Sequence, residues 1–442
     1  MTRTRDAVRR MHEWHLIALA ALLIAVAVWL LGCSSPAPVA PVVQTDVRVQ
    51  GRTVSWTTSK PTYAVVVWGT HAGRYDHVAY PPAPIADRSA TVEHAITLLA
   101  AASQDSVYAV VESWNDPADP VVTPLAVRLG SLPATGALLT WTMIDVGFGD
   151  SHLLTMPVTH AHVLIDAGER RDAPNVERFL ADAGVTRLDE VLMTHAHEDH
   201  IGGMVGESWD PNDGVLGVMP VGALIEGPPP SVSRSAYDEL VALCASRAIP
   251  RRRVASGDDD GSNPALTWDP DVRVRVLHAG GGRALGGDTE SEWLNDDSIV
   301  LRITYGNVTI AMGGDAESPV ESALLAQHAV LDASLLKVHH HGSANASDPG
   351  WLDAVHPRVG LIPITTYEST GGTLPSGIVL QRLRDRGVDI YASDRAERLG
   401  LQYTGDTGQN VTVVTNGSSY EVAVAPSASR HWPPDVATAA GR

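Results

Sequence analysis

The chain has 442 residues, of which 44% are hydrophobic and 19% charged, and its 51 acidic and 32 basic side chains give a formal net charge of -19. This hydrophobic content is enough to bury sizeable cores, which excludes a disordered chain, and the length suggests two or three domains. The negative charge repels polyanions at long range, so indiscriminate binding to DNA, RNA or anionic lipid is excluded as well.

The N-terminal region is arranged as a secretion signal followed by a spacer. A stretch with four arginines precedes the unbroken apolar run 16–31, and Gly32-Cys33 follows directly. This layout is typical of a signal peptide, here 1–32, and Leu30-Leu31-Gly32-Cys33 resembles a lipobox, which predicts a diacylglyceryl group on Cys33. A retained anchor helix is the alternative, although the run is shorter than the ~20 residues that span a bilayer. We expect an extracytoplasmic, membrane-anchored lipoprotein with residues 33–41 as a Pro/Ser/Ala tether.

Residues 42–130 are predicted to form a small all-β sandwich. Short alternating or β-branched runs recur there between turn residues, which is the spacing of antiparallel strands. The runs Val54–Thr58, Tyr63–Thr70 and Val107–Val111 resemble a fibronectin type III module. The resemblance implies a spacer, or a docking surface for a surface partner.

From residue 138 onward strands alternate with helical stretches, which predicts an α/β domain. The apolar strand Leu188–Thr194 runs straight into His195-Ala196-His197-Glu198-Asp199-His200. His195 and His197 can both face one ion, because Ala196 points away between them. Asp199 and His200 can reach a second ion from the first turn of the next helix. Two divalent ions roughly 3.5–4 Å apart can share and deprotonate a water, so the motif predicts a metal site.

Five motifs in a consistent order resemble the metallo-β-lactamase fold family, and within it the hydrolase domain of ComEC-type DNA-uptake proteins. The motifs are Met143–Ser151, Val163–Gly168, Asp297–Arg302, Ile310–Asp315 and Leu335–Ser343, with Phe148 where that group carries Gln. The resemblance covers about residues 138–405. It implies an αββα sandwich with one or two metal ions at the strand ends. We assign residues 138–424 to this hydrolase domain and residues 425–442 to a flexible tail.

Two later residues complete the predicted metal centre. Asp315 ends an apolar run, where a carboxylate can bridge two ions, and His340 follows the strand Ala333–Val338 at the same edge of the sheet. The predicted ligands are His195, His197, Asp199, His200, Asp315 and His340, with Asp199 and Asp315 as catalytic residues. His341 is the alternative to His340, since three consecutive histidines leave the register open. Asp166 either accepts hydrogen bonds from the His-rich loop or caps a turn.

Two stretches depart from the family pattern, and two further segments are expected to form loops. Many relatives carry Gly-His-Pro where this chain has Gly372-Thr373-Leu374-Pro375, and Asn295-Asp296-Asp297 stands where lactonase-like members supply a histidine. Oxygen ligands there would favour Mn²⁺ over Zn²⁺, and whether one ion or two binds stays open. The Gly- and Pro-rich segment from Pro211 to Pro230 is expected to loop over the site. Arg251–Arg253 are expected to be solvated loop residues, charge-paired with the acidic stretch 257–261.

These features predict a lipid-anchored, metal-dependent hydrolase in which a metal-bridging hydroxide attacks a phosphodiester. The resemblance implies DNA as the substrate class, whereas the net charge of -19 favours short or single-stranded nucleic acid or a small phosphodiester. A β-lactam or lactone hydrolase is the alternative, because the same hydroxide can attack a carbonyl carbon. A third reading is a surface-binding protein whose hydrolase domain is vestigial.

Overall fold

The computed structural model describes most of the chain from residue 41 to residue 424. The described residues are 41–71, 75–82, 90–100, 106–115, 121–128, 137–207, 213–364, 367–369, 372–393, 395–398, 401–404 and 410–424. The predicted signal peptide, nearly all of the predicted tether and the predicted tail lie outside them. Within the described part of the chain, no helix is both long and apolar enough to span a membrane.

The N-terminal region is mostly β, as predicted. Its strands are β1 (Gln44–Gln50), β2 (Thr53–Gly69), β3 (His77–Ala79), β4 (Thr91–Thr97), β5 (Ser106–Trp114) and β6 (Val121–Arg128). The long β2 pairs over its first half with β1 and β4, and over its second half with β5 and β3, always antiparallel. Alternate side chains of β2, among them Trp56 and Trp68, are buried in a core of their own. This alternation is the period of two that a strand imposes on its side chains.

The first sheet of the α/β domain carries the His-rich motif. Its strands are β7 (Leu139–Met143), β8 (Ser151–Thr155), β9 (His162–Ala167), β10 (Leu188–Leu192), β11 (Val221–Glu226) and β12 (Arg251–Arg253), and its helices are α2 (Ala173–Asp182), α3 (Glu198–Val205), α4 (Val215–Val218) and α5 (Ser235–Ser246). Strands β9 to β12 are parallel, while β7, β8 and β9 are antiparallel neighbours. On the other side of β7 the sheet continues through β23 (Val411–Thr415) and β24 (Tyr420–Val424) to β3 of the N-terminal region.

The second sheet carries Asp315 and the three consecutive histidines. Its strands are β13 (Val272–His278), β14 (Val300–Tyr305), β15 (Val308–Met312), β16 (Leu335–Lys337), β17 (Val359–Ile362), β20 (Asp389–Ala392), β21 (Arg395–Arg398) and β22 (Leu401–Thr404). The helices between these strands are α6 (Gly282–Leu285), α7 (Glu290–Asn295), α8 (Ser318–Ala326), α9 (Pro349–Val355) and α10 (Gly377–Arg384), and a small hairpin joins β18 (Tyr367–Ser369) to β19 (Gly372–Leu374). Strands β15, β16, β17 and β20 are parallel, so their carboxyl ends meet at one edge.

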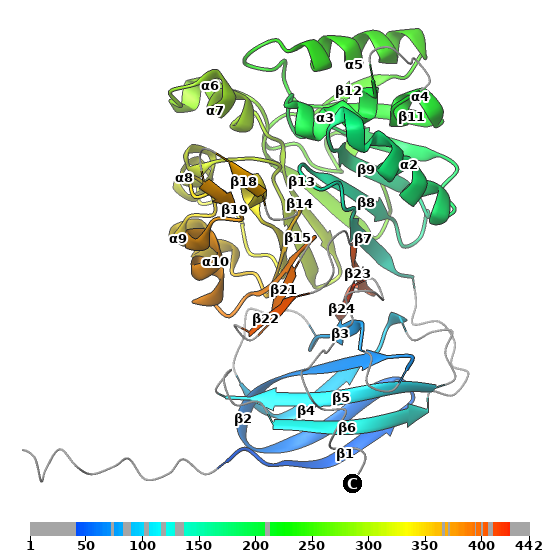
Figure 1. Ribbon diagram of the computed structural model, residues 1–442, viewed down its shortest axis with the longest axis vertical. Coiled ribbons are helices and arrows are strands. Elements are labelled where there is room, and N and C mark those ends of the chain that lie inside the picture. The colour runs from blue at the N-terminus through cyan, green and yellow to red at the C-terminus, as the bar shows by residue number, and fades with distance from the viewer. Residues whose placement is uncertain are drawn as a thin grey trace, which may run out of the picture. The chain divides into compact units, whose positions relative to one another are not determined.

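The two sheets pack face to face with helices on their outer faces (Figure 1). A central core joins residues of both sheets, such as Ile165 and Leu192 from the first with Ile310 and Leu335 from the second. A second core lies between the first sheet and α2, α3 and α5, and a third between the second sheet and α8, α9 and α10. This is the predicted αββα architecture, and it arises because the central strands are apolar on both faces.

The expectation of a loop from Pro211 to Pro230 is wrong. The segment contains α4 and β11, and Ala223, Leu224 and Ile225 of β11 are fully buried. Glycine and proline mark the turns of this segment, but its short apolar run is long enough for a parallel strand between β10 and β12.

The expectation for the three arginines is also wrong. They form strand β12, in which Arg251 and Arg253 pair with Glu226 and Arg252 pairs with Glu190. Their ion partners therefore come from the neighbouring strands and not from the acidic stretch 257–261.

Candidate metal centre

The His-rich motif lies where β10 ends and α3 begins. His195 and His197 occupy the loop, and Asp199 and His200 lie in the first turn of α3. Gly202 and Gly203 let this helix pack directly on the backbone of residues 167–170, where a Cβ atom would collide with Arg170 N or Ala167 O. The two glycines therefore hold the turn that carries Asp199 and His200 against the sheet.

Asp315 and the three histidines approach from the second sheet. Asp315 follows β15, and His339, His340 and His341 form a tight turn after the adjacent parallel strand β16. His340 and His341 both have left-handed backbone conformations, with φ of 46° and 49°. Non-glycine residues seldom adopt this conformation, so the surrounding packing holds the turn in place and thereby sets the direction of each imidazole.

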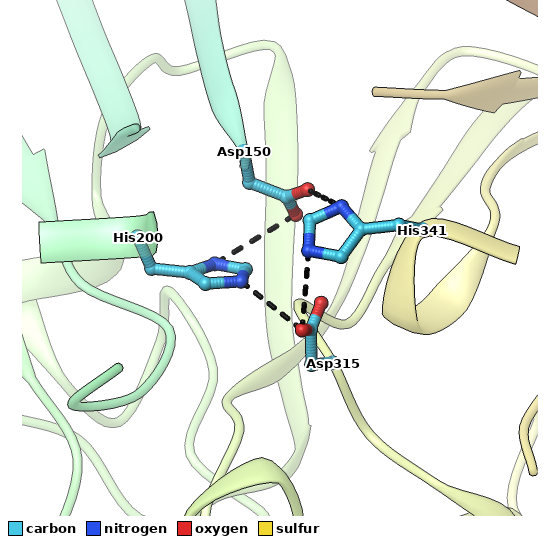
Figure 2. A group of neighbouring side chains, drawn as sticks. All are labelled: Asp150, His200, Asp315 and His341. Carbon is cyan, nitrogen blue, oxygen red and sulfur yellow. Dashed lines mark ion pairs between the residues drawn. The ribbon is translucent and has the colours of Figure 1, made fainter. Parts of the chain in front are cut away.

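The buried imidazoles of His200 and His341 and the carboxylates of Asp150 and Asp315 converge at the centre of the site (Figure 2), and Asp199 lies beside them. The Nε2 atoms of His200 and His341 lie 3.2 and 3.3 Å from Oδ2 of Asp315. Oδ2 of Asp199 lies 3.3 Å from Nε2 of His341 and 3.9 Å from Nε2 of His200. Histidine nitrogens and carboxylate oxygens at such spacing are a suitable ligand set for a Zn²⁺ or Mn²⁺ ion.

The opposite ring edges of these histidines are held by the protein. Nδ1 of His200 lies 2.8 Å from Oδ2 of Asp166, and the Thr194 backbone amide donates to Oδ1 of the same carboxylate. Nδ1 of His341 donates to the carbonyl oxygen of Pro363 over 3.2 Å. These contacts place the protons on Nδ1, which leaves the Nε2 lone pairs for an ion. The predicted hydrogen bonding of Asp166 with the His-rich loop is confirmed.

The other predicted ligands flank this group. Nε2 of His195 lies 3.0 Å from Nδ1 of His197, and the ring of His195 lies 4.1 Å from that of His200, centroid to centroid. Nε2 of His340 lies 3.8 Å from Oδ2 of Asp315. The six predicted residues therefore surround one place, and their role as ligands stays a prediction.

The register of the three histidines favours the alternative in the sequence analysis. His341 is buried and belongs to the convergent group, whereas His340 is partly exposed and its Nδ1 contacts Asn345 and Glu317. Asn295 donates to the same Glu317 carboxylate, so the Asn295 stretch reaches His340 through Glu317. His339 is buried against Glu321 and Trp351 instead, and it braces the turn.

Electrostatics within the cluster also indicate a cation site. Burial by itself lowers the pKa of His200, but the carboxylates of Asp315, Asp150, Asp166 and Asp199 outweigh it and raise that pKa well above its usual value. Burial likewise opposes a charged His341, yet Asp315 and Asp150 raise its pKa well above the usual range. The carboxylates therefore create a strong demand for positive charge, which divalent ions can meet in place of protons.

The unmet hydrogen-bonding capacity fits a metal. Nε2 of His200 and Nε2 of His341 are both buried, and neither has a hydrogen-bond partner among the described residues. Buried polar atoms without partners are costly and rare, and here the two converge on carboxylate oxygens. The residues present thus suit one or two divalent ions.

Two residues of the cluster received no role in the sequence analysis. Asp150 comes from the Gly149-Asp150-Ser151 turn before β8, and Lys337 is the last residue of β16. Their side chains are buried and form an ion pair of 2.6 Å. The signal for Lys337 is a lysine inside an apolar strand of a chain with only two lysines, since lysine is rarely buried without a partner.

Comparison with known proteins agrees with this geometry. The family described as the metallo-beta-lactamase superfamily matches residues 144–362. The matched residues lie within the αββα domain described above. The predicted fold class, an α/β metallo-β-lactamase fold after a mostly-β N-terminal region, is therefore confirmed.

Distant homologues include proteins of bacterial competence systems. The chain is 26% identical over 283 residues to ComE operon protein 3 of Bacillus subtilis, which covers 60% of this chain and 33% of that protein. It is 25% identical over 278 residues to Competence protein ComA of Neisseria gonorrhoeae, covering 62% and 34%. The chain thus spans about a third of these relatives. A solved metallo-β-lactamase from Cronobacter sakazakii, an HARLDQ motif mutant, is 15% identical, with 57% of this chain and 76% of that chain covered and a TM-score of 0.26.

Proposed function

We propose that this protein is a metal-dependent hydrolase that cleaves phosphodiester bonds. The observation that carries the metal dependence is the convergence of two buried Nε2 atoms, from His200 and His341, on Oδ2 of Asp315, where they make close ion-pair contacts without a hydrogen bond. The choice of phosphodiesters rests on the motifs shared with ComEC-type proteins and on the two competence-protein homologues.

The residues divide the work between holding ions and orienting the ligands. His200, His341, Asp199 and Asp315 would hold one ion, and His195 and His197 would hold a second beside Asp315. Bound divalent ions supply a water of lowered pKa and stabilise the negative charge that develops on the scissile phosphate. Asp166 holds the proton of His200 on Nδ1, and the Pro363 carbonyl does the same for His341.

The substrate is proposed to be short or single-stranded nucleic acid or a small phosphodiester. The net charge of -19 opposes the approach of a long polyanion. Glu169 adds to this, because its carboxylate interacts with the like charges of Asp199 and Glu198, while Arg171 offsets part of this repulsion.

The decisive experiment assays the full-length protein, purified in detergent, with Mn²⁺ or Zn²⁺ added. The substrates are bis-p-nitrophenyl phosphate, single-stranded DNA and a chromogenic β-lactam, and bound metal is measured by elemental analysis. We expect phosphodiester turnover that disappears in His197→Ala, together with the ion that His195 and His197 would hold. The matched control is His71→Ala, an exposed histidine of the N-terminal region, which should leave both unchanged.

Other outcomes would redirect the proposal. Turnover of the β-lactam alone would favour the carbonyl hydrolase reading over the phosphodiesterase. Protein that binds no metal would contradict metal-dependent hydrolysis and favour a surface-binding role.

The location is a separate proposal. We propose that the protein is held on the outer side of the membrane by a lipid on Cys33, and that the N-terminal β region meets a surface partner. Mass spectrometry of the membrane fraction should find a chain that begins at a lipid-modified Cys33. An uncleaved, unmodified N-terminus would contradict this.

A further inference from the structure

Lys337 is a buried cation with a complete set of acceptors. Its side chain is 1% exposed, and its Nζ lies 2.6 Å from Oδ2 of Asp150, 2.6 Å from the carbonyl oxygen of Gly314 and 3.5 Å from Oδ1 of Asp315. An ammonium group has three N–H donors, and here three oxygens surround it. A buried lysine is tolerated when it is paired in this way, so its position is tightly determined.

Asp150 lies behind the two central imidazoles. Its carboxylate oxygens approach the Nδ1 atoms, at 3.2 Å for His341 and 3.9 Å for His200. The carboxylate of Asp315 approaches the Nε2 atoms of the same rings (Figure 2). The Nδ1 and Nε2 atoms of an imidazole point in diverging directions, so the two Nε2 atoms are directed toward Asp315 and away from Asp150.

Asp315 divides its two oxygens between different tasks. Oδ1 faces Lys337 at 3.5 Å, and Oδ2 faces the imidazoles of His200 and His341. Only one oxygen of this carboxylate is therefore directed toward the ions.

We infer that Lys337 is a positioning residue that links Asp150, on the Nδ1 side of the two histidines, to Asp315, on their Nε2 side. In this way it keeps Asp150 out of the coordination sphere of the proposed metal ions. The ammonium holds Oδ2 of Asp150, while Oδ1 of Asp150 faces Nδ1 of His341 at 3.2 Å, so in this orientation both oxygens are engaged away from the Nε2 atoms. It also restricts Asp315 to coordination through Oδ2. The inference rests on the proposed metal centre and deepens it.

The test uses Co²⁺ as the only added metal and the full-length protein in detergent. The visible spectrum of bound Co²⁺ reports the number and type of ligands, which a purely structural role of Lys337 would not change. Lys337→Met frees Asp150 Oδ2 and Asp315 Oδ1, so we expect bound Co²⁺ with a changed spectrum of higher coordination number. The matched control is Lys60→Met, which removes the only other lysine and should leave the spectrum unchanged.

Asp150→Asn provides a second test that does not depend on the folding of Lys337→Met. As an outer partner, its loss should weaken Co²⁺ binding by about 10–100-fold and leave the spectrum of the saturated protein unchanged. A changed spectrum, or no binding at any Co²⁺ concentration, would make Asp150 a ligand and overturn the inference. A wild-type spectrum in Lys337→Met would also overturn it. If the wild-type protein binds no Co²⁺, the proposed metal centre itself fails.

Discussion

Two buried carboxylates of the second sheet, Asp389 and Asp315, differ in what surrounds them. Asp389 is 1% exposed, and its Oδ2 lies 2.9 Å from the Tyr80 hydroxyl and 3.2 Å from an Arg358 nitrogen. Asp315 is 2% exposed, but its Oδ2 faces imidazole nitrogens that lack hydrogen-bond partners among the described residues. Burial is the same in both places, so burial does not identify the functional carboxylate.

The difference shows how the fold uses buried charge in two ways. Donors satisfy Asp389, and they join Tyr80 of the N-terminal region to β20, so this carboxylate serves stability. Asp315 contacts the Lys337 ammonium through Oδ1, and its Oδ2 faces the imidazoles of His200 and His341, which could hold a cation with it, so we propose ligand binding as its role.

The largest effect is expected at the three histidines. His341→Ala removes a convergent Nε2 and should lower metal-dependent kcat/KM by about a thousandfold, which corresponds to about 4 kcal/mol of transition-state stabilisation. His340→Ala, the adjacent and more exposed histidine, should cost only about tenfold. Steady-state kinetics with matched metal content would measure both. Equal losses in the two variants would contradict the assignment of His341 to the central group.

Asp389→Asn tests the stabilising carboxylate. The variant leaves Arg358 without its buried counter-charge and should lower the free energy of unfolding by about 3 kcal/mol, while the affinity for metal stays unchanged. Urea unfolding followed by tryptophan fluorescence and a Co²⁺ titration would measure the two quantities. Asp385→Asn, at an exposed position of the same segment, is the control and should change stability by less than about 0.5 kcal/mol. Loss of metal binding in Asp389→Asn would remove the contrast with Asp315.

Glu421 of β24 is a third buried carboxylate, and it makes stability depend on pH. Burial raises its pKa to about 7, against the opposing effect of hydrogen bonds from the Ala100 and Leu99 amides. Because the folded state holds this proton more tightly than the unfolded state, the contribution is present below pH 4.5 and is lost as pH rises toward 7.

The size of this pH effect can be measured against Glu421→Gln. The wild-type protein should lose about 3 kcal/mol more than the variant between pH 4.5 and pH 7, with metal removed by chelation. Urea unfolding at a series of pH values gives the two curves. Parallel curves for the two proteins would show that Glu421 does not titrate in this range.

The smallest effect is expected at the exposed ion pair of Arg252 with Glu190. The Arg252 side chain is 46% exposed, so Arg252→Gln should change the free energy of unfolding by about 0–1 kcal/mol. Its neighbour Arg251 pairs with Glu226, which is 3% exposed, and Arg251→Gln should cost about 2 kcal/mol. Urea unfolding of both variants compares a partly buried acidic partner, Glu190, with a fully buried one, Glu226, on adjacent strands. An equal loss of unfolding free energy in the two variants would mean that burial of the acidic partner does not affect the strength of the ion pair.

Local sequence patterns were enough to predict the first half of the site. His195 to His200 follow an apolar strand, and Gly202-Gly203 follow them, so the loop, the helix start and its close packing could all be inferred from contiguous residues. Asp166 could be inferred as a partner for the same reason, because a polar residue at the end of a neighbouring parallel strand lies at the same edge.

The second half could be predicted only in part. The strand before the three histidines was clear, but positive φ angles at His340 and His341 decide which imidazole turns inward, and no periodicity predicts them. Asp150 belongs to the motif Met143–Ser151, yet the role of its side chain depends on the ion pair with Lys337, which belongs to the other sheet. The error at Pro211–Pro230 has a related cause, since turn residues concealed a short buried strand that only its two neighbours stabilise.

The amino-acid sequence by itself determined the αββα fold class and the edge of the sheets at which the predicted ligands lie, because apolar strands and their terminal polar residues are local features. The packing of the two sheets decided which side chains share the centre. It placed His341 beside His200 and buried Lys337 between Asp150 and Asp315. Such choices depend on distances between residues far apart in the chain, and only the folded structure sets those distances.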